Sequence, residues 1–250
     1  MAVLELQEIS VPGREQPRLE RVSLRIEAGE RVALLGPSGA GKSTLLAVAN
    51  GLLQPQSGRV LWNDAPRARS ERARRRQQAR IGTLWQDLRL IEELSVQQNL
   101  NSGCLARWGW PRAVLNLLLP LDSEACAQAL RRVDLSPELL DQPVAELSGG
   151  QRQRVAIARL LRQEPLLLLA DEPLASLDPR LARELLQLLL EQASAPRALL
   201  LSLHRPDLLA GFDRVIGVRQ GRVQFDEPAA AVDSAAIQAL YAGTAAAASP

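Results

Sequence analysis

The stretch "ERVALLGPSGAGKSTLLAVANGL", residues 30–52, decides the fold class of this chain. Residues 30–36 have the pattern of an apolar strand that ends on glycine. Residues 41–52 have helical periodicity and finish near a second stop signal, Gly51. Strand, glycine-rich loop and helix therefore follow one another directly, which predicts the start of an α/β fold.

The loop between them, "GPSGAGKST", matches the G-x-x-x-x-G-K-[ST] pattern of phosphate-binding loops. Its glycines let backbone N–H groups turn inward as an anion nest, and the following helix directs its positive end at the same place. Lys42 is the only lysine among 30 basic residues, and a compact ammonium fits such a nest better than a planar guanidinium. The Ser43 hydroxyl is a candidate magnesium ligand. The residues predicted to hold the nucleotide are Gly36, Pro37, Ser38, Gly39, Ala40, Gly41, Lys42, Ser43 and Thr44.

A second apolar strand, "LLLLADEP" at residues 166–173, ends in two adjacent carboxylates. Ligands of open α/β sheets bind at the carboxyl ends of the strands. There Asp171 would hold magnesium through water, and Glu172 would orient and deprotonate an attacking water. Taken alone, this ending is also typical of a strand that runs into a solvated turn. Together with the phosphate loop it predicts a nucleotide hydrolase.

Composition excludes several other classes of protein. Apolar residues make up 46% and charged residues 23% of the chain, as in an ordinary globular protein. The formal net charge of +2 gives no electrostatic reason to expect a nucleic-acid partner. Cys104 and Cys126 have neither metal-ligand spacing nor the pattern of a disulfide framework, so we expect a reducing compartment. The first residues lack a signal-peptide pattern, and no apolar run approaches the length of a membrane span.

The segment "LSGGQRQRVAIARLL", residues 147–161, resembles the signature of ABC-type ATPase subunits. Further motifs follow in that family's order: Gln86 in "LWQD" resembles the Q-loop, Asp178 in "ASLD" the D-loop, and His204 the switch histidine. The resemblance covers about residues 3–241. It implies a P-loop NTPase of the ABC type, with a mostly parallel sheet core, an antiparallel β subdomain and a helical insertion subdomain.

The same resemblance implies a single ATPase domain over residues 1–244. Residues 1–87 and 148–244 would form the RecA-like core with its β subdomain, and residues 88–147 the helical subdomain. Residues 245–250 are predicted to be a disordered tail.

The resemblance also implies ATP and Mg²⁺ as cofactors and a head-to-tail dimer that closes around ATP. Glu172, His204 and Lys42 would be the catalytic residues, and Ser43, Gln86 and Asp171 would hold the metal. Hydrolysis would remove the shared anion and release the dimer. The residues expected to reach the ATP of the other copy are Ser148, Gly149, Gly150, Gln151 and Asp178.

Simpler interpretations of these residues stay open. His204 could cap a strand in a polar niche, Gln86 could be an ordinary polar residue after a strand, and "SGGQ" could be a helix-capping turn. Val11 aligns with the position where the family usually carries an aromatic residue that stacks on adenine. Valine offers apolar contact without stacking, which leaves the selectivity for adenine open.

The 61 residues between Gln86 and Ser148 include Trp108 and Trp110 and resemble those of phosphonate-type importer ATPases. This implies an ATPase on the cytoplasmic side of the cell membrane, attached peripherally. Its partners would be a second copy, transmembrane permease subunits and, indirectly, a periplasmic or surface substrate-binding protein. The alternatives are the ATPase of an exporter or lipoprotein-release system, a soluble ABC protein of translation or DNA repair, and a nucleotide-binding scaffold without turnover.

Two features of the sequence are not explained by this interpretation. The arginine-rich run over residues 67–80 could dock on acidic phospholipids or the permease, although such a run is commonly a solvated basic face. The two tryptophans could pack against the permease or belong to the core of the helical insertion.

Overall fold

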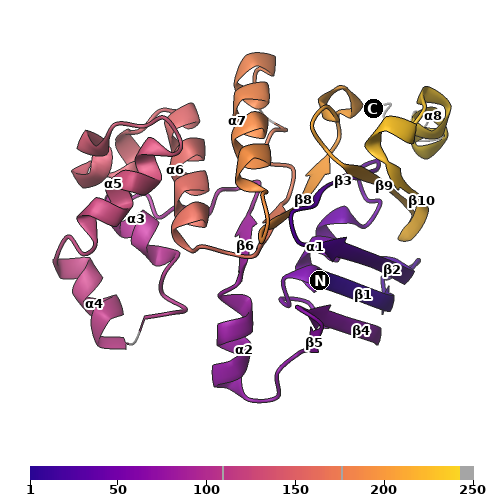
Figure 1. Cartoon of the computed structure of the whole chain (residues 1–250), viewed down its shortest axis with the longest axis horizontal. Coiled ribbons are helices and arrows are strands. Elements are labelled where there is room, and N and C mark those ends of the chain that lie inside the picture. The colour runs from indigo at the N-terminus through magenta and orange to yellow at the C-terminus, as the bar shows by residue number, and fades with distance from the viewer. Residues whose placement is uncertain (109, 176, 243–250) are drawn as a thin grey trace.

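The computed structural model describes residues 1–108, 110–175 and 177–242. Its larger sheet has six strands in the order β10-β9-β3-β8-β7-β6 (Figure 1). They are β3 (Arg31–Leu35), β6 (Ile81–Leu84), β7 (Leu167–Ala170), β8 (Ala198–Leu203), β9 (Arg214–Arg219) and β10 (Arg222–Pro228). Strands β6, β7, β8, β3 and β9 pair in parallel, and β10 pairs with β9 in antiparallel orientation.

The central strands are almost entirely apolar because both faces of this sheet are covered. Every residue of β7 and β8 is buried. One face packs against helices α6 (Gly149–Arg162) and α7 (Pro179–Gln192), and the other face packs against α1 (Lys42–Ala49). The register pairs Ala170 with Leu201, so β7 and β8 end side by side at one edge of the sheet.

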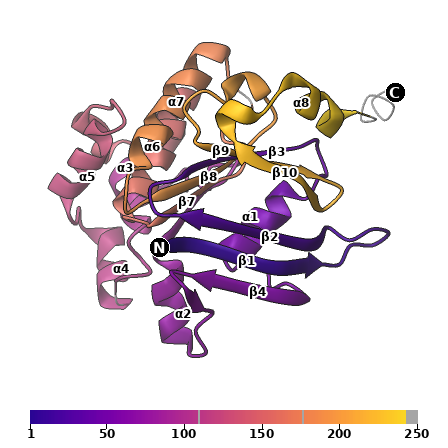
Figure 2. The same ribbon diagram turned by 45° about the vertical axis from the view of Figure 1, so that its right-hand side comes forward.

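A second, antiparallel sheet has the order β2-β1-β4-β5 and lies beside α1 (Figure 2). Its strands are β1 (Ala2–Val11), β2 (Leu19–Glu27), β4 (Ser57–Trp62) and β5 (Ala65–Pro66). Residues of β2 alternate between buried and more accessible positions, as expected when only one face of a sheet packs on a core.

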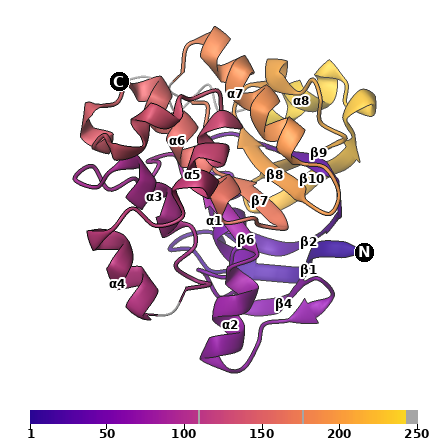
Figure 3. The same ribbon diagram turned by 60° about the vertical axis from the view of Figure 1, so that its left-hand side comes forward.

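Between β6 and α6 most of the described chain is helical. The helices there are α3 (Val96–Ser102), α4 (Trp110–Leu118), α5 (Ser123–Arg131) and the short 3-10 helices η1 (Pro137–Asp141) and η2 (Val144–Glu146). Helices α3 and α5 pack against α6, and α4 lies farther from α6, next to α3 (Figure 3). The remaining helices are α2 (Glu71–Gln78), η3 (Pro206–Leu208), η4 (Ala229–Ala231) and α8 (Ser234–Tyr241).

This architecture confirms the predicted fold class: a mostly parallel core, an antiparallel sheet and a helical insertion. The subdomain boundaries after residues 87 and 147 stay predictions, and the predicted tail at 245–250 lies outside the described residues. None of the helices in the described ranges is long and apolar enough to cross a membrane.

Candidate functional site

The phosphate loop connects β3 to α1 and is folded tightly against neighbouring backbone. A Cβ on Gly41, whose φ is 107°, would lie 2.5 Å from the carbonyl oxygen of Arg18. A Cβ on Gly36 would lie 2.1 Å from the carbonyl oxygen of Val218. Glycine is therefore needed at both positions. Within the described residues no side chain caps the start of α1, so its first N–H groups are available to an anion.

Lys42 begins α1 and is only 3% exposed. Its Nζ donates to the carbonyl oxygens of Gly36, at 2.7 Å, and Pro37, at 3.0 Å, and lies 3.3 Å from Oε1 of Glu172. Burial lowers the pKa of Lys42, and the neighbouring Glu172 carboxylate opposes that shift. A buried ammonium that faces mostly neutral carbonyls would be stabilised by an incoming polyanion.

Asp171 follows β7 and accepts two hydroxyl hydrogen bonds at the same oxygen. Ser43 donates to Oδ1 over 3.1 Å, and Ser202 donates to it over 3.0 Å. Ser202 also accepts a hydrogen bond of 2.9 Å from the backbone N–H of Glu172. One fully buried hydroxyl thus fixes both members of the acidic pair. Sequence reasoning missed Ser202, although it is the one polar residue in the apolar strand β8.

Glu172 and His204 face each other across the ends of β7 and β8. His204 Nε2 lies 2.5 Å from Oε2 of Glu172. Glu172 has a φ of 47°, in the left-handed region that a non-glycine residue adopts only at some cost. The hydrogen bond from the Glu172 N–H to Ser202 holds this backbone conformation. The Glu172 carboxylate then contacts both Lys42 and His204.

A hollow of about 380 Å³ opens beside the phosphate loop. It is lined by Arg18, Ser38, Gly39, Ala40, Gly41, Lys42, Ser43, Thr44, Gln86 and Glu172. Gln86 reaches it from just beyond β6. Arg18, which sequence reasoning missed, reaches it from the segment before β2. Val11 does not line it: that side chain is 4% exposed and belongs to the core beneath the antiparallel sheet.

The signature residues lie elsewhere, at the start of α6. Ser148 Oγ accepts a hydrogen bond of 3.3 Å from the N–H of Gln151, and the Gln151 side chain accepts one of 2.9 Å from the N–H of Ser148. A Cβ on Gly149 would meet no atom within 4 Å, and one on Gly150 would meet only the Leu181 side chain, at 3.3 Å or more. Nothing in the described packing of this chain requires glycine at 149. A glycine there suits the close approach of another molecule.

The predicted site is therefore brought together only in part. Lys42, Ser43, Gln86, Asp171, Glu172 and His204 converge at one edge of the sheet. The described residues that line the hollow include neither the signature nor Asp178. Asp178 caps α7 by accepting hydrogen bonds of 3.1 Å from the N–H groups of Arg180 and Leu181.

The signature helix is tied to the segment that follows Gln86. The Arg159 guanidinium on α6 donates to the carbonyl oxygens of Leu88 and Arg89, at 2.5 Å each. Leu88 and Arg89 both have φ values in the left-handed region, 55° and 48°. Burial lowers the pKa of Arg159. Sequence reasoning missed this contact, which links residues 88–89 directly to α6.

Comparisons with known proteins agree with this geometry. The family model of ABC transporters matches residues 19–175. The chain is similar to the phosphonates import ATP-binding protein PhnC of Pseudomonas putida, with 48% identity over 227 residues that cover 90% of this chain and 84% of that protein. PhnC 1 of Pseudomonas aeruginosa is 47% identical over 230 residues, which cover 91% and 86% of the two chains.

Solved structures give the same result. CbiO1 from Clostridium perfringens, part of the ABC transporter complex cbiONQ, superposes with a TM-score of 0.76 at 29% identity, covering 97% of this chain and 92% of that one. The ATP-binding cassette MJ0796, as a post-hydrolysis dimer with ADP and Pi, has a TM-score of 0.76 at 27% identity, covering 90% and 98%. The family model and these relatives show that the chain belongs to the ABC transporter family.

Proposed function

We propose that this chain is the ATP-hydrolysing, energy-coupling subunit of an importer for phosphonates or a related phosphorus oxyanion. The observation that carries the hydrolytic part is the connected group Lys42, Glu172 and His204 at the mouth of the phosphate loop. The import direction and the class of cargo rest on the relatives that are named as phosphonate importers.

In this proposal the N–H groups of the loop and Lys42 bind the β- and γ-phosphates of ATP. Phosphate oxygens would take over the contacts that Lys42 now makes with the Gly36 and Pro37 carbonyls. Glu172 would accept a proton from the water that attacks the γ-phosphorus, and His204 would hold that carboxylate in place.

The residues present fit a magnesium ion. Ser43 and Asp171 offer a hydroxyl and a carboxylate oxygen that lie 3.1 Å apart, and Gln86 adds an amide oxygen at the rim of the hollow. Mg²⁺ prefers such hard oxygen ligands and usually takes the rest from phosphate and water. When bound, the ion would neutralise charge on the phosphates.

A second copy of the chain would supply the missing half of the site. In a head-to-tail dimer the N-terminus of α6 would point at the γ-phosphate bound by the other copy, with Ser148 and Gly149 at the contact. Gln151, Gly150 and Asp178 would lie at the same interface. Because the shared anion holds the two copies together, ATP would favour the closed dimer and hydrolysis the open state.

The permease subunits would be the partners that use this cycle, with Gln86 and the segment fastened by Arg159 near the contact. The subunit would then be held at the cytoplasmic side of the cell membrane. A periplasmic or surface substrate-binding protein would deliver the cargo without touching this chain.

Reconstitution tests the proposal directly. The subunit, its permease and the substrate-binding protein are placed in proteoliposomes, and phosphate release is measured with 2-aminoethylphosphonate, with maltose and without cargo. We expect stimulation by the phosphonate alone. Equal rates with all three, or stimulation by maltose, would contradict the assigned cargo class. No ATP hydrolysis under any condition would contradict the enzymatic assignment.

A further inference from the structure

The apolar face of helix α4 points to solvent, and its polar residue Asn116 points into the protein. Asn116 is its only buried residue, at 4% exposure, and contacts the rest of the helical insertion. Trp110, Val114, Leu117 and Leu118 share one helical face by their spacing and are 81%, 43%, 55% and 76% exposed. An ordinary surface helix shows the opposite arrangement. This exposed face is called the α4 apolar face below.

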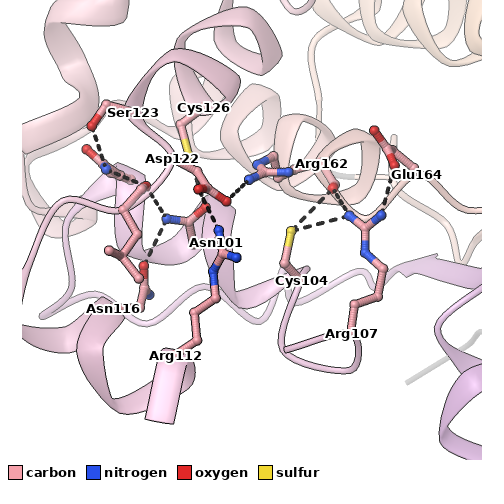
Figure 4. Close-up of polar contacts among 12 residues, drawn as sticks. Asn101, Cys104, Arg107, Arg112, Asn116, Asp122, Ser123, Cys126, Arg162 and Glu164 are labelled. Carbon is pink, nitrogen blue, oxygen red and sulfur yellow. Dashed lines mark hydrogen bonds and ion pairs between the residues drawn. The ribbon is translucent and has the colours of Figure 1, made fainter. Parts of the chain in front are cut away.

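Polar contacts fix the helix in that orientation (Figure 4). Arg112 forms an ion pair of 2.7 Å with Asp122, which also pairs over 2.6 Å with Arg162 of the signature helix. The Asn116 side chain accepts a hydrogen bond of 2.8 Å from Asn101 of α3. Rotating α4 to bury its apolar face would break these contacts. The outward presentation of the apolar face is therefore built into the insertion.

A strongly basic surface lies at the same end of the molecule. Residues 67–80 contain seven arginines and one acidic residue, Glu71, and most of the arginines are exposed. Helix α2, within this segment, and α4 both lie toward the lower end of the molecule in Figure 1 and Figure 3. Arg76 and Arg80 line one hollow together with Arg107, which precedes α4. The basic surface is thus continuous with the base of α4.

The charge on this end is predominantly positive. Residues 67–80 hold seven arginines against one acid, whereas the whole chain has a net charge of only +2. Arg107 and Arg112, close to α4, are paired with Glu164 and Asp122. The rest of the chain is consequently net negative. Exposed aliphatic and indole side chains next to clustered arginines are the combination by which interfacial helices bind anionic bilayers.

We propose that the α4 apolar face and the arginines of residues 67–80 form a docking surface for a bilayer that contains anionic phospholipid. Trp110, Leu117 and Leu118 enter the boundary between headgroups and acyl chains, and the arginines contact lipid phosphates. This contact goes beyond the permease contact proposed above and is independent of the transported cargo. It attaches the subunit directly to the membrane, beside its transmembrane partner.

Vesicle flotation tests this surface with the intact subunit. The vesicles contain either equal parts of phosphatidylglycerol and phosphatidylcholine or phosphatidylcholine alone, at low and high salt. We expect binding to the anionic vesicles that weakens at high salt. The double variant Leu117→Gln/Leu118→Gln and the triple variant Arg69→Gln/Arg72→Gln/Arg76→Gln should each bind at least about tenfold more weakly. Leu52→Gln, at a 63% exposed leucine outside α4, is the matched control and should bind as the wild type does.

Three outcomes would overturn the proposal. They are equal binding to neutral and anionic vesicles, no binding to either, and undiminished binding by the α4 double variant. Light scattering on the same samples tests whether a second copy of the chain covers the α4 apolar face instead. A double variant with altered self-association and intact vesicle binding would assign this face to contact between two copies. ATP binding by both variants should match the wild type, so failure of the membrane contact is distinguishable from failure of the ATPase assignment.

Discussion

The phosphate-loop region and the signature region differ in how many contacts their functional residues make within one chain. In the first, Lys42, Asp171, Glu172, Ser202 and His204 already contact one another through hydrogen bonds and ion pairs. In the second, Ser148 caps its own helix and Gly149 faces open space. This difference supports the proposal that one chain holds a binding and proton-accepting half-site and that its signature contacts a nucleotide held by another copy.

The largest effect is expected at Glu172. Glu172→Gln keeps the shape of the side chain but removes the proton acceptor, so ATP hydrolysis should fall by about 10²- to 10⁴-fold. ATP binding should remain. Single-turnover phosphate release measures the first and nucleotide titration the second. Glu191→Gln, at an exposed carboxylate on α7, is the control. Near-normal turnover by Glu172→Gln would assign the proton acceptor elsewhere.

Removal of the buried ammonium should mainly weaken binding. Lys42→Met is expected to lower ATP affinity by about 10- to 100-fold, because charge-assisted hydrogen bonds to phosphate are lost. The wild type should also lose affinity as pH rises, beginning below the ordinary lysine pKa of 10.5, since burial lowers the pKa of Lys42. Deprotonation of Lys42 removes its attraction to phosphate, so ATP affinity falls as the pH rises. Lys42→Met should lack this pH dependence in a fluorescent-nucleotide titration; an identical pH profile in both proteins would contradict the role of Lys42.

Ser202 should have a smaller effect that appears in two measurements. Ser202→Ala leaves the Glu172 N–H without its partner and removes one of the two hydroxyl hydrogen bonds at Oδ1 of Asp171, so we expect kcat to fall about tenfold with a smaller change in ATP affinity. Loss of these hydrogen bonds should lower the free energy of unfolding by about 1–3 kcal/mol. Ser102→Ala, whose hydroxyl donates to the Asn99 carbonyl, is the control. Lower stability with unchanged kcat would reduce Ser202 to a packing residue.

Arg18 should have the smallest effect. Its exposed guanidinium lines the hollow, so Arg18→Ala should weaken ATP binding by no more than about fivefold, as is usual for an exposed charge. Arg14→Ala removes an exposed arginine from the same loop that does not line the hollow, and should have no effect. If the two variants behave alike, Arg18 does not contact the nucleotide.

Local patterns were enough to predict an α/β fold, the phosphate loop and the acidic pair after an apolar strand, because each depends on residues close together in the sequence. Gln86 and His204 were predicted only through the family resemblance. Ser202 and Arg159 could not be found in this way, because their roles depend on which strand lies beside β7 and which loop lies beside α6. Val11 shows the same limit: alignment placed it near the base, whereas packing buries it in the core.

The orientation of α4 could not be predicted from the sequence, for a related reason. A helical period reveals that one face is apolar, but it does not reveal which face meets the protein. That choice is made by Arg112 and Asn116, whose partners Asp122 and Asn101 lie on other elements.

The central claim is that a second copy completes the site, and the most direct measurement is the mass of Glu172→Gln by light scattering, with and without ATP and Mg²⁺. We expect a monomer without nucleotide and a dimer with it. Adding Ser148→Arg or Gly149→Val should abolish the dimer while leaving ATP binding intact, since neither residue lines the hollow at the phosphate loop and a Cβ on Gly149 meets no atom within 4 Å in the described chain. A protein that binds ATP and stays monomeric, or a dimer that tolerates both signature changes, would contradict the account.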